Sequence, residues 1–390
     1  MKILLLGTDV WQSDCSFAQD CPILWEDGLV LAVGEACRRF VPDRVFRADG
    51  FTVLPGLVDV HTHGRAGFDF VSATEEQMQK MKADYLCRGV TSVFATLASG
   101  SFSEWKTAIR RIQDCGFDGL HLEGRYLDHK KRGAHAAELL VPLDADDLEQ
   151  ILDGVSIPCH VTAAYEHDVD GSFAACARRH GATLGLGHTS ATAEETRLAI
   201  SRGVTSFTHL FNAMPPLHHR EGGPVCVALG GEGYAELIAD GLHICPDMVA
   251  LAYRCLGDSR TVLVTDSMEA TGCGDGVYSI AGQPVFVRNG RAVTEDGTLA
   301  GSTLNLWDAV KNLMRFASIP LEKAIACATR NPAKMVGIDD WVGTLEAGKR
   351  ADMLIVDAYC HRRGVIARGD LTLEAQSCLV DITTEYERKN

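Results

Sequence analysis

From about residue 54 onward, short apolar runs alternate with longer stretches of helical periodicity. This alternation is typical of repeated βα units around a parallel sheet. The mean spacing of the runs is about 30 residues, the length that a βαβ unit needs. The pattern predicts eight strands, at 57–61, 91–96, 119–123, 157–162, 183–188, 206–209, 235–239 and 261–266. Eight such parallel strands close into a TIM-like (β/α)8 barrel.

The two ends of the chain show a different pattern. Residues 1–53 contain short apolar runs separated by turn residues and lack amphipathic helical periodicity. Residues 341–357 predict a turn-rich return into a strand, which we expect to pair with the N-terminal segment. The sequence therefore predicts an α/β protein with a barrel at 54–345 and a small β-sandwich-like domain formed by 1–53 and 346–390.

Composition narrows the class of protein. The net charge of −15 argues against nucleic acid and anionic membrane surfaces as partners. The apolar start of the chain is interrupted at Asp9, too early for a signal peptide or a membrane span. Fourteen cysteines occur without a Cys-x-x-Cys pair or a repeating framework, so we expect reduced thiols and a cytoplasmic protein.

The segment Pro-Gly-Leu-Val-Asp-Val-His-Thr-His-Gly ends an apolar run with His61 and His63. Side chains two residues apart on a strand point to the same side. Both imidazoles can therefore face one metal ion at the C-terminal mouth of the first strand, where barrel active sites are built. A single His-x-His pair is weak evidence by itself.

Further candidate ligands or bases follow other apolar runs, namely Glu123, His188, His209 and Asp266. Taken singly, each has a structural alternative: an ion-paired carboxylate, a hydrogen-bonded histidine near the core, or a helix cap. Together they favour a site for Zn²⁺ or Fe²⁺, because nitrogen and carboxylate ligands without thiolates suit these ions. Such a cation lowers the pKa of a bound water toward about 7, and Asp266 is placed to act as general acid and base. The residues by themselves predict a metal-dependent hydrolase of an unspecified amide.

Several longer motifs resemble those of the N-acetylglucosamine-6-phosphate deacetylases of the amidohydrolase superfamily. The resemblance covers nearly the whole chain and is carried by the segments 55–64, 121–124, 131–135, 187–190, 208–214, 239–243, 263–267 and 298–303. It implies hydrolysis of N-acetyl-D-glucosamine 6-phosphate to D-glucosamine 6-phosphate and acetate. It also implies that Glu123, His188 and His209 hold the main metal ion and that His61 and His63 are available for a second. One or two divalent ions are expected, Zn²⁺ first, with Fe, Mn or Co as alternatives.

The same resemblance implies the substrate contacts. His135 would polarise the acetyl carbonyl, and Arg220 would reach the active site of the neighbouring subunit of a homodimer. The remaining implied substrate-binding residues are Gly124, Asn212, Ala213, His243, Leu299, Ala300 and Gly301. We interpret Lys130, Lys131 and Arg132 as a solvated loop, and His160, His167, His180, His218 and His219 as structural or solvated histidines.

Two positions depart from the family pattern, since Arg125 and Ala136 each stand where these deacetylases have proline. Both lie beside His135, so they bear on the substrate rather than on the metal chemistry. Three alternatives stay open: the N-acetylgalactosamine 6-phosphate epimer, another barrel amidohydrolase with a different amide substrate, and an inactive barrel that binds phosphosugars as a sensor. The last would be expected to lack a ligand or the base.

Overall fold

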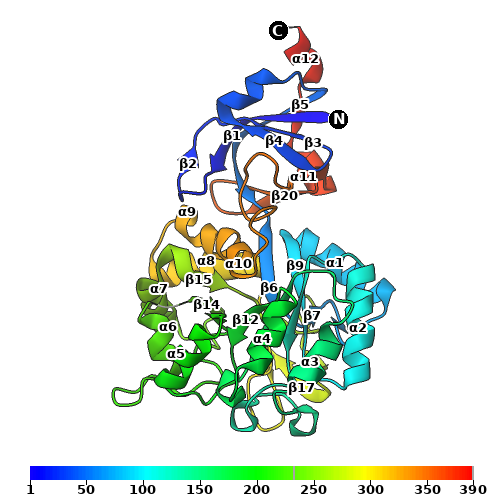
Figure 1. Cartoon of the computed structure of the whole chain (residues 1–390). Coiled ribbons are helices and arrows are strands. Elements are labelled where there is room, and N and C mark those ends of the chain that lie inside the picture. Colours follow the sequence, from blue (N-terminus) through cyan, green and yellow to red (C-terminus); the bar gives the residue numbers. More distant parts are fainter. Residues whose placement is uncertain (232, 389–390) are drawn as a thin grey trace.

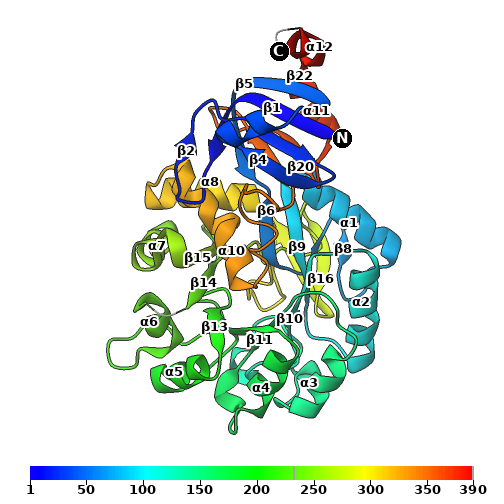
Figure 2. The same ribbon diagram turned by 45° about the horizontal axis from the view of Figure 1, so that its top comes forward.

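The computed structural model of the chain describes residues 1–231 and 233–388 (Figure 1). Eight parallel strands form a nearly closed barrel, and a separate sheet built from both ends of the chain lies at one end of it. The predicted fold class is confirmed. In Figure 2 the helices form a ring around the barrel strands.

The barrel sheet runs in the order β15-β14-β13-β12-β11-β10-β9-β6, and all of its neighbours are parallel. The gap between the last and first strands is bridged where the amide of Asp266 donates to the carbonyl of His61 at 2.9 Å. The strands are β6 (Leu57–Thr62), β9 (Val90–Leu97), β10 (Gly119–Glu123), β11 (Cys159–Ala163), β12 (Thr183–Leu186), β13 (Val204–Phe207), β14 (Tyr234–Leu237) and β15 (Thr261–Leu263).

Amphipathic helices cover the outside of the barrel. In α2, the buried side chains Trp105, Ala108, Ile109 and Ile112 follow the spacing that places them on one helix face. Capping boxes define the starts of three helices, with Thr74, Ser101 and Thr192 as the N-cap residues. The helices are α1 (Glu75–Cys87), α2 (Phe102–Asp114), α3 (Ala145–Leu152), α4 (Ser172–Arg179), α5 (Ala193–Ser201), α6 (Gly223–Leu229), α7 (Pro246–Arg260), α8 (Leu306–Ala317), α9 (Leu321–Ala324) and α10 (Arg330–Met335).

The terminal sheet has nine strands, and its β19 pairs antiparallel with β5, as expected for the return of the chain. Alternate side chains of β1 pack on opposite faces: Ile3 and Leu5 join one buried cluster, and Leu4 joins another. The strands are β1 (Lys2–Trp11), β2 (Phe17–Ala18), β3 (Ile23–Glu26), β4 (Leu29–Val33), β5 (Arg44–Pro55), β19 (Met353–Val356), β20 (Arg362–Ala367), β21 (Asp370–Leu371) and β22 (Val380–Asp381), with helices α11 (Leu373–Cys378) and α12 (Thr383–Glu387).

A three-stranded antiparallel sheet, not predicted from the sequence, follows the last barrel strand. It consists of β16 (Gly276–Ile280), β17 (Gln283–Arg288) and β18 (Arg291–Val293). Its inner side chains pack against Ala300, so this sheet supports the loop at 298–301. A short pair, β7 (Gly64–Arg65) and β8 (Phe68–Asp69), follows the first barrel strand. Within 1–231 and 233–388, no helix is both long and apolar enough to cross a membrane.

Candidate active site

The structure brings all six predicted metal ligands together at the C-terminal mouth of the barrel. They form two buried groups, each with ligand atoms within 4.8 Å of one another: His61, His63, Glu123 and Asp266 in one, and Glu123, His188 and His209 in the other. Glu123 belongs to both groups because it lies at their centre. Its Oε2 atom is 2.9 Å from the Nε2 atoms of both His61 and His63, and its Oε1 atom is 2.9 Å from Nε2 of His209.

Three of these residues lie beyond the ends of the strands that were predicted to carry them. The strands β12, β13 and β15 end two or three residues before His188, His209 and Asp266 respectively, so the three predicted strand ends were placed too late. These residues adopt φ values of 46°, 32° and 46°. Left-handed backbone at a residue other than glycine is costly and is concentrated at functional sites. The turned backbone directs the three side chains toward Glu123.

The histidine hydrogen bonds show that the site is suited to a cation. Nδ1 of His188 lies 2.7 Å from the carbonyl oxygen of Lys131 and must donate to it, so Nε2 carries a lone pair. This lone pair faces Nε2 of His209 at 3.0 Å and Glu123 Oε1 at 3.4 Å. Acceptor atoms aimed at one another are unfavourable unless a proton or a cation lies between them. The residues present therefore fit a divalent metal ion.

The charges of the site lead to the same conclusion. Burial alone would raise the pKa of Asp266, but the nearby imidazoles of His61 and His63 outweigh it and lower this pKa to about 2. Burial alone would lower the pKa of His63, but the hydrogen bonds to Asp266 and Glu123 raise it to about 9. The carboxylates thus stay ionised and favour positive charge beside them, which a divalent cation supplies.

His135 lies beside this ligand set, with its ring centroid 4.9 Å from that of His188. Burial, followed by the effect of His188, lowers the pKa of His135 to about 3, so the ring is neutral. Its Nδ1 atom is 2.9 Å from Ser99 Oγ and 3.4 Å from the Ser99 amide, which can only donate. Nδ1 is therefore an acceptor, and Nε2 carries the hydrogen. This imidazole can donate a hydrogen bond but cannot act as a base through Nε2.

A cavity of about 360 Å³ opens over the ligand set. It is lined by most of the predicted substrate-binding residues, namely His135, Asn212, Ala213, His243, Leu299, Ala300 and Gly301. Asn212 donates through Nδ2 to the carbonyl of His209 at 3.1 Å, and Nδ1 of His243 lies 2.7 Å from Asp240. The polar side chains at this wall are thus held in fixed orientations.

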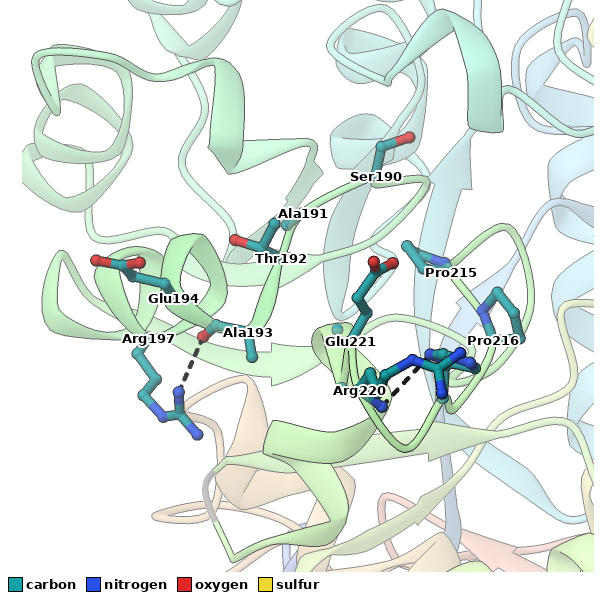
Figure 3. Close-up of a pocket in the computed structure, with 13 residues that line it drawn as sticks. Ser190, Ala191, Thr192, Ala193, Glu194, Arg197, Pro215, Pro216, Arg220 and Glu221 are labelled. Atoms are coloured by element: carbon teal, nitrogen blue, oxygen red, sulfur yellow. Dashed lines mark hydrogen bonds between the residues drawn. The ribbon is translucent and has the colours of Figure 1, made fainter.

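Two predicted substrate-binding residues do not line this cavity. Gly124 instead allows close packing, because a Cβ atom there would come within 2.5 Å of the Ser99 amide nitrogen. Arg220 is exposed, with Nη1 2.7 Å from Nε2 of its neighbour His219. It lines a different surface pocket of about 670 Å³ between the start of α5 and the loop at 215–223 (Figure 3).

Several residues at the site were not predicted. Lys130 is exposed, as expected for a solvated loop, but both Lys130 and Lys131 also line the cavity, and the Lys131 carbonyl accepts from the ring of His188. Ile280 and Thr298 reach the cavity from the unpredicted three-stranded sheet and the loop after it. Glu236 is fully buried next to His61. The sequence feature that could have identified it is a charged residue within the apolar strand Tyr-Ala-Glu-Leu. By contrast, His160 is buried and hydrogen-bonded to Thr183, in agreement with the structural interpretation.

Residues 52–381 match the model of the amidohydrolase family, and the chain belongs to this family. Among its relatives are the N-acetylglucosamine-6-phosphate deacetylases of Vibrio furnissii, 33% identical over 336 residues (83% of each chain), and of Bacillus subtilis, 34% identical over 332 residues (82% of this chain and 84% of the relative). The N-acetylgalactosamine-6-phosphate deacetylase of Escherichia coli O157:H7 is 33% identical over 356 residues, covering 88% of this chain and 93% of the relative. The resemblance seen in the sequence motifs is confirmed.

Solved structures of such deacetylases share the whole architecture. A variant of the Mycobacterium smegmatis enzyme, solved in complex with N-acetyl-D-glucosamine 6-phosphate, superposes with a TM-score of 0.87 at 31% identity, covering 95% of this chain and 99% of that chain. The Thermotoga maritima enzyme gives a TM-score of 0.84 at 30% identity, covering 94% and 99%. Both the barrel and the terminal sheet therefore belong to the common fold.

Proposed function

We propose that this chain hydrolyses the acetamido group of N-acetyl-D-glucosamine 6-phosphate, releasing acetate and D-glucosamine 6-phosphate. The observation that carries the proposal is the placement of a neutral, Nε2-protonated His135 beside the ligand set that contains Asp266. These are the parts that amide hydrolysis needs: a carboxylate to accept a proton and a fixed donor for the carbonyl oxygen. The similarity to deacetylases over more than four fifths of the chain supports the substrate.

The cation ligands, Asp266 and His135 each have a separate role in the proposed reaction. A divalent cation held by Glu123, His188 and His209 would lower the pKa of a water molecule and polarise the carbonyl. Asp266 accepts the proton of the attacking water and transfers it to the amine nitrogen as the C–N bond breaks. His135 donates a hydrogen bond from Nε2 to the carbonyl oxygen as that oxygen gains negative charge. This exchange of one proton leaves Asp266 ionised at the end of the cycle.

The phosphate is assigned to the wall formed by Asn212, Ala213 and His243, with Arg220 contributed by a second copy of the chain. Arg220 is exposed and outside the cavity of its own chain, which supports a contribution to a neighbouring one. Its planar guanidinium suits phosphate oxygens. The working form in this proposal is a homodimer.

The metal is assigned as Zn²⁺, because the ligands are imidazoles and carboxylates without thiolates and a position remains for water. The protein is assigned to the cytoplasm. This assignment is supported by its fourteen cysteines, which are all free, as expected in a reducing compartment.

An acetate-release assay on three substrates tests the proposal: N-acetylglucosamine 6-phosphate, the same sugar without phosphate, and N-acetylgalactosamine 6-phosphate. We expect turnover of the first, at least tenfold lower kcat/KM without the phosphate, and loss of activity after treatment with a chelator. Inactivity on both phosphorylated sugars with metal present would contradict the proposal. If Arg220→Ala left kcat/KM for the phosphorylated sugar unchanged, an amidohydrolase with another amide substrate would be favoured instead.

The galactosamine epimer is the second candidate substrate. It is supported by the Escherichia coli O157:H7 relative, which is as similar to this chain as the Vibrio furnissii one. A higher kcat/KM for N-acetylgalactosamine 6-phosphate in the same assay would establish it in place of the first.

A further inference from the structure

Glu236 is a carboxylate placed inside the barrel. It is 0% exposed and is the charged residue of β14, whose other side chains are Tyr234, Ala235 and Leu237. Burying an ionised carboxylate is unfavourable unless hydrogen bonds and positive charge compensate it. The contacts of Glu236 should therefore show what it does.

The contacts lead to both groups of candidate metal ligands. Oε2 of Glu236 accepts from Nδ1 of His61 at 2.9 Å and from the backbone amide of His209 at 3.1 Å. Its other oxygen, Oε1, is buried and has no hydrogen-bond partner within the described ranges. Glu236 therefore spans from one group to the other, and its charge is not balanced by a lysine or arginine ion pair in the described part of the chain.

The hydrogen bond to Glu236 fixes the tautomer of His61. Because a carboxylate only accepts, Nδ1 of His61 keeps its hydrogen, and Nε2 is the atom that offers a lone pair when the ring is neutral. Nε2 faces Glu123 Oε2 at 2.9 Å and Asp266 Oδ1 at 3.5 Å. In the neutral ring three acceptor atoms would converge on one point, so a proton or a cation must lie between them.

We propose that Glu236 is the positioning residue of His61, one of the four side chains, with His63, Glu123 and Asp266, that would hold a second divalent ion. The inference rests on the proposed metal-dependent function. It goes beyond that function in giving Glu236, which is neither a candidate ligand nor part of the cavity lining, the role of orienting a ligand. Glu236 acts by orienting His61, by raising the basicity of its Nε2 atom and by adding negative charge beneath the two ions.

The experiment measures metal content rather than activity. Metal-free protein is reconstituted with Zn²⁺, desalted and analysed by mass spectrometry for bound zinc, and the two affinities are measured by chelator competition. We expect two ions in the wild type. In Glu236→Leu, the weaker site should lose about 10- to 100-fold in affinity while the other ion stays bound. His61→Ala should lose the same ion. In Glu236→Gln the affinity of the weaker site should lie between those of the wild type and Glu236→Leu, because Gln keeps an oxygen acceptor. The exposed Glu194→Gln serves as the control, with both affinities unchanged.

Thermal melting separates positioning from a general structural role. Metal-free Glu236→Leu should melt at a lower temperature than the metal-free wild type, because the His61 ring and the His209 amide lose their acceptor. Its rise in melting temperature on adding Zn²⁺ should be smaller. Two ions bound with wild-type affinities in Glu236→Leu would overturn this inference alone, as would a rise in melting temperature on adding Zn²⁺ that equals the wild-type rise. Failure of the wild type to bind any divalent ion would overturn the proposed function as well.

Discussion

The hydroxyl oxygen of Ser99 lies 2.9 Å from Nδ1 of His135, and the amide nitrogen of Ser99 lies 3.4 Å from the same atom. Both residues are buried, so the pair is shielded from water. Ser99 lies two residues after the end of the second barrel strand, whereas His135 lies in a loop after the third. The tautomer of the proposed carbonyl-polarising histidine is thus set by the end of a neighbouring strand.

The first prediction follows from this pair. In Ser99→Ala one of the two donors to Nδ1 is lost, so His135 loses part of its orientation and kcat for acetate release should fall about tenfold. KM should change less than twofold, because the proposed phosphate contacts are made by other residues of the cavity. Ser99→Thr keeps the hydroxyl and should restore most of kcat. Steady-state kinetics measure this, and full kcat in Ser99→Ala would show that the hydroxyl is dispensable.

A second prediction concerns Asp266. Asp266→Asn removes the proposed proton acceptor, so kcat should fall by about 10²- to 10⁴-fold. The substrate should still bind, and calorimetry with the intact phosphorylated sugar can measure its Kd without turnover. His63→Asn is a useful comparison because it removes an imidazole beside Asp266 without removing the carboxylate. A variant Asp266→Asn with more than a tenth of wild-type kcat would assign the base to another residue.

The fold and the clustering of the candidate metal ligands could be predicted from the sequence because both depend on local patterns. The alternation of strands and helices gives the barrel, and polar residues at the ends of apolar runs give His61, His63 and Glu123. The exact strand ends could not be read for His188 and His209, because the run of residues continues to each histidine without a break, while the histidine itself adopts the left-handed region.

Residues that act through long-range contacts were not accessible in this way. Glu236 is separated from His61 by 175 positions, and the hydrogen bond between them exists only when the barrel closes. The three-stranded sheet at 276–293 alternates polar and apolar residues, but it leaves Val277 and Phe286 exposed, so its buried face is not evident from the sequence. Such contacts need the tertiary structure.

A third prediction links metal binding to pH. The pKa of His63 is raised to about 9 by Asp266 and Glu123 against the effect of burial, so without a bound cation the ring holds a proton at neutral pH. A metal ion needs the lone pair of the same ring and must displace this proton. The apparent affinity for Zn²⁺ should therefore rise with pH up to about 9, by up to tenfold per pH unit for each proton released.

Chelator competition over the range from about pH 6 to 9 measures this dependence, and proton release into weakly buffered solution counts the protons. His63→Asn should release one proton fewer than the wild type. Binding that is independent of pH, with no proton released, would contradict the charge balance described for the site.

The last prediction concerns Arg125, where the family pattern has proline. The residue has φ of 55°, a value that a proline ring cannot adopt because it holds φ near −65°. Its guanidinium is directed to Asp147 at 2.8 and 3.0 Å and to the carbonyl of Gly100 at 3.2 Å, and it does not line the cavity. We therefore expect a structural role and no contact with the sugar.

Arg125→Ala should lower the free energy of unfolding by about 1–3 kcal/mol, because Asp147 and the Gly100 carbonyl lose a charged donor. KM for the phosphorylated sugar should change less than twofold. Urea unfolding followed by circular dichroism measures the free energy of unfolding, and steady-state kinetics measure KM. The matched control is Arg110→Ala, on the exposed side of α2. A tenfold rise in KM with unchanged stability would instead place Arg125 in substrate recognition. In that case the exchange of proline for arginine would distinguish the substrate of this enzyme from that of its relatives.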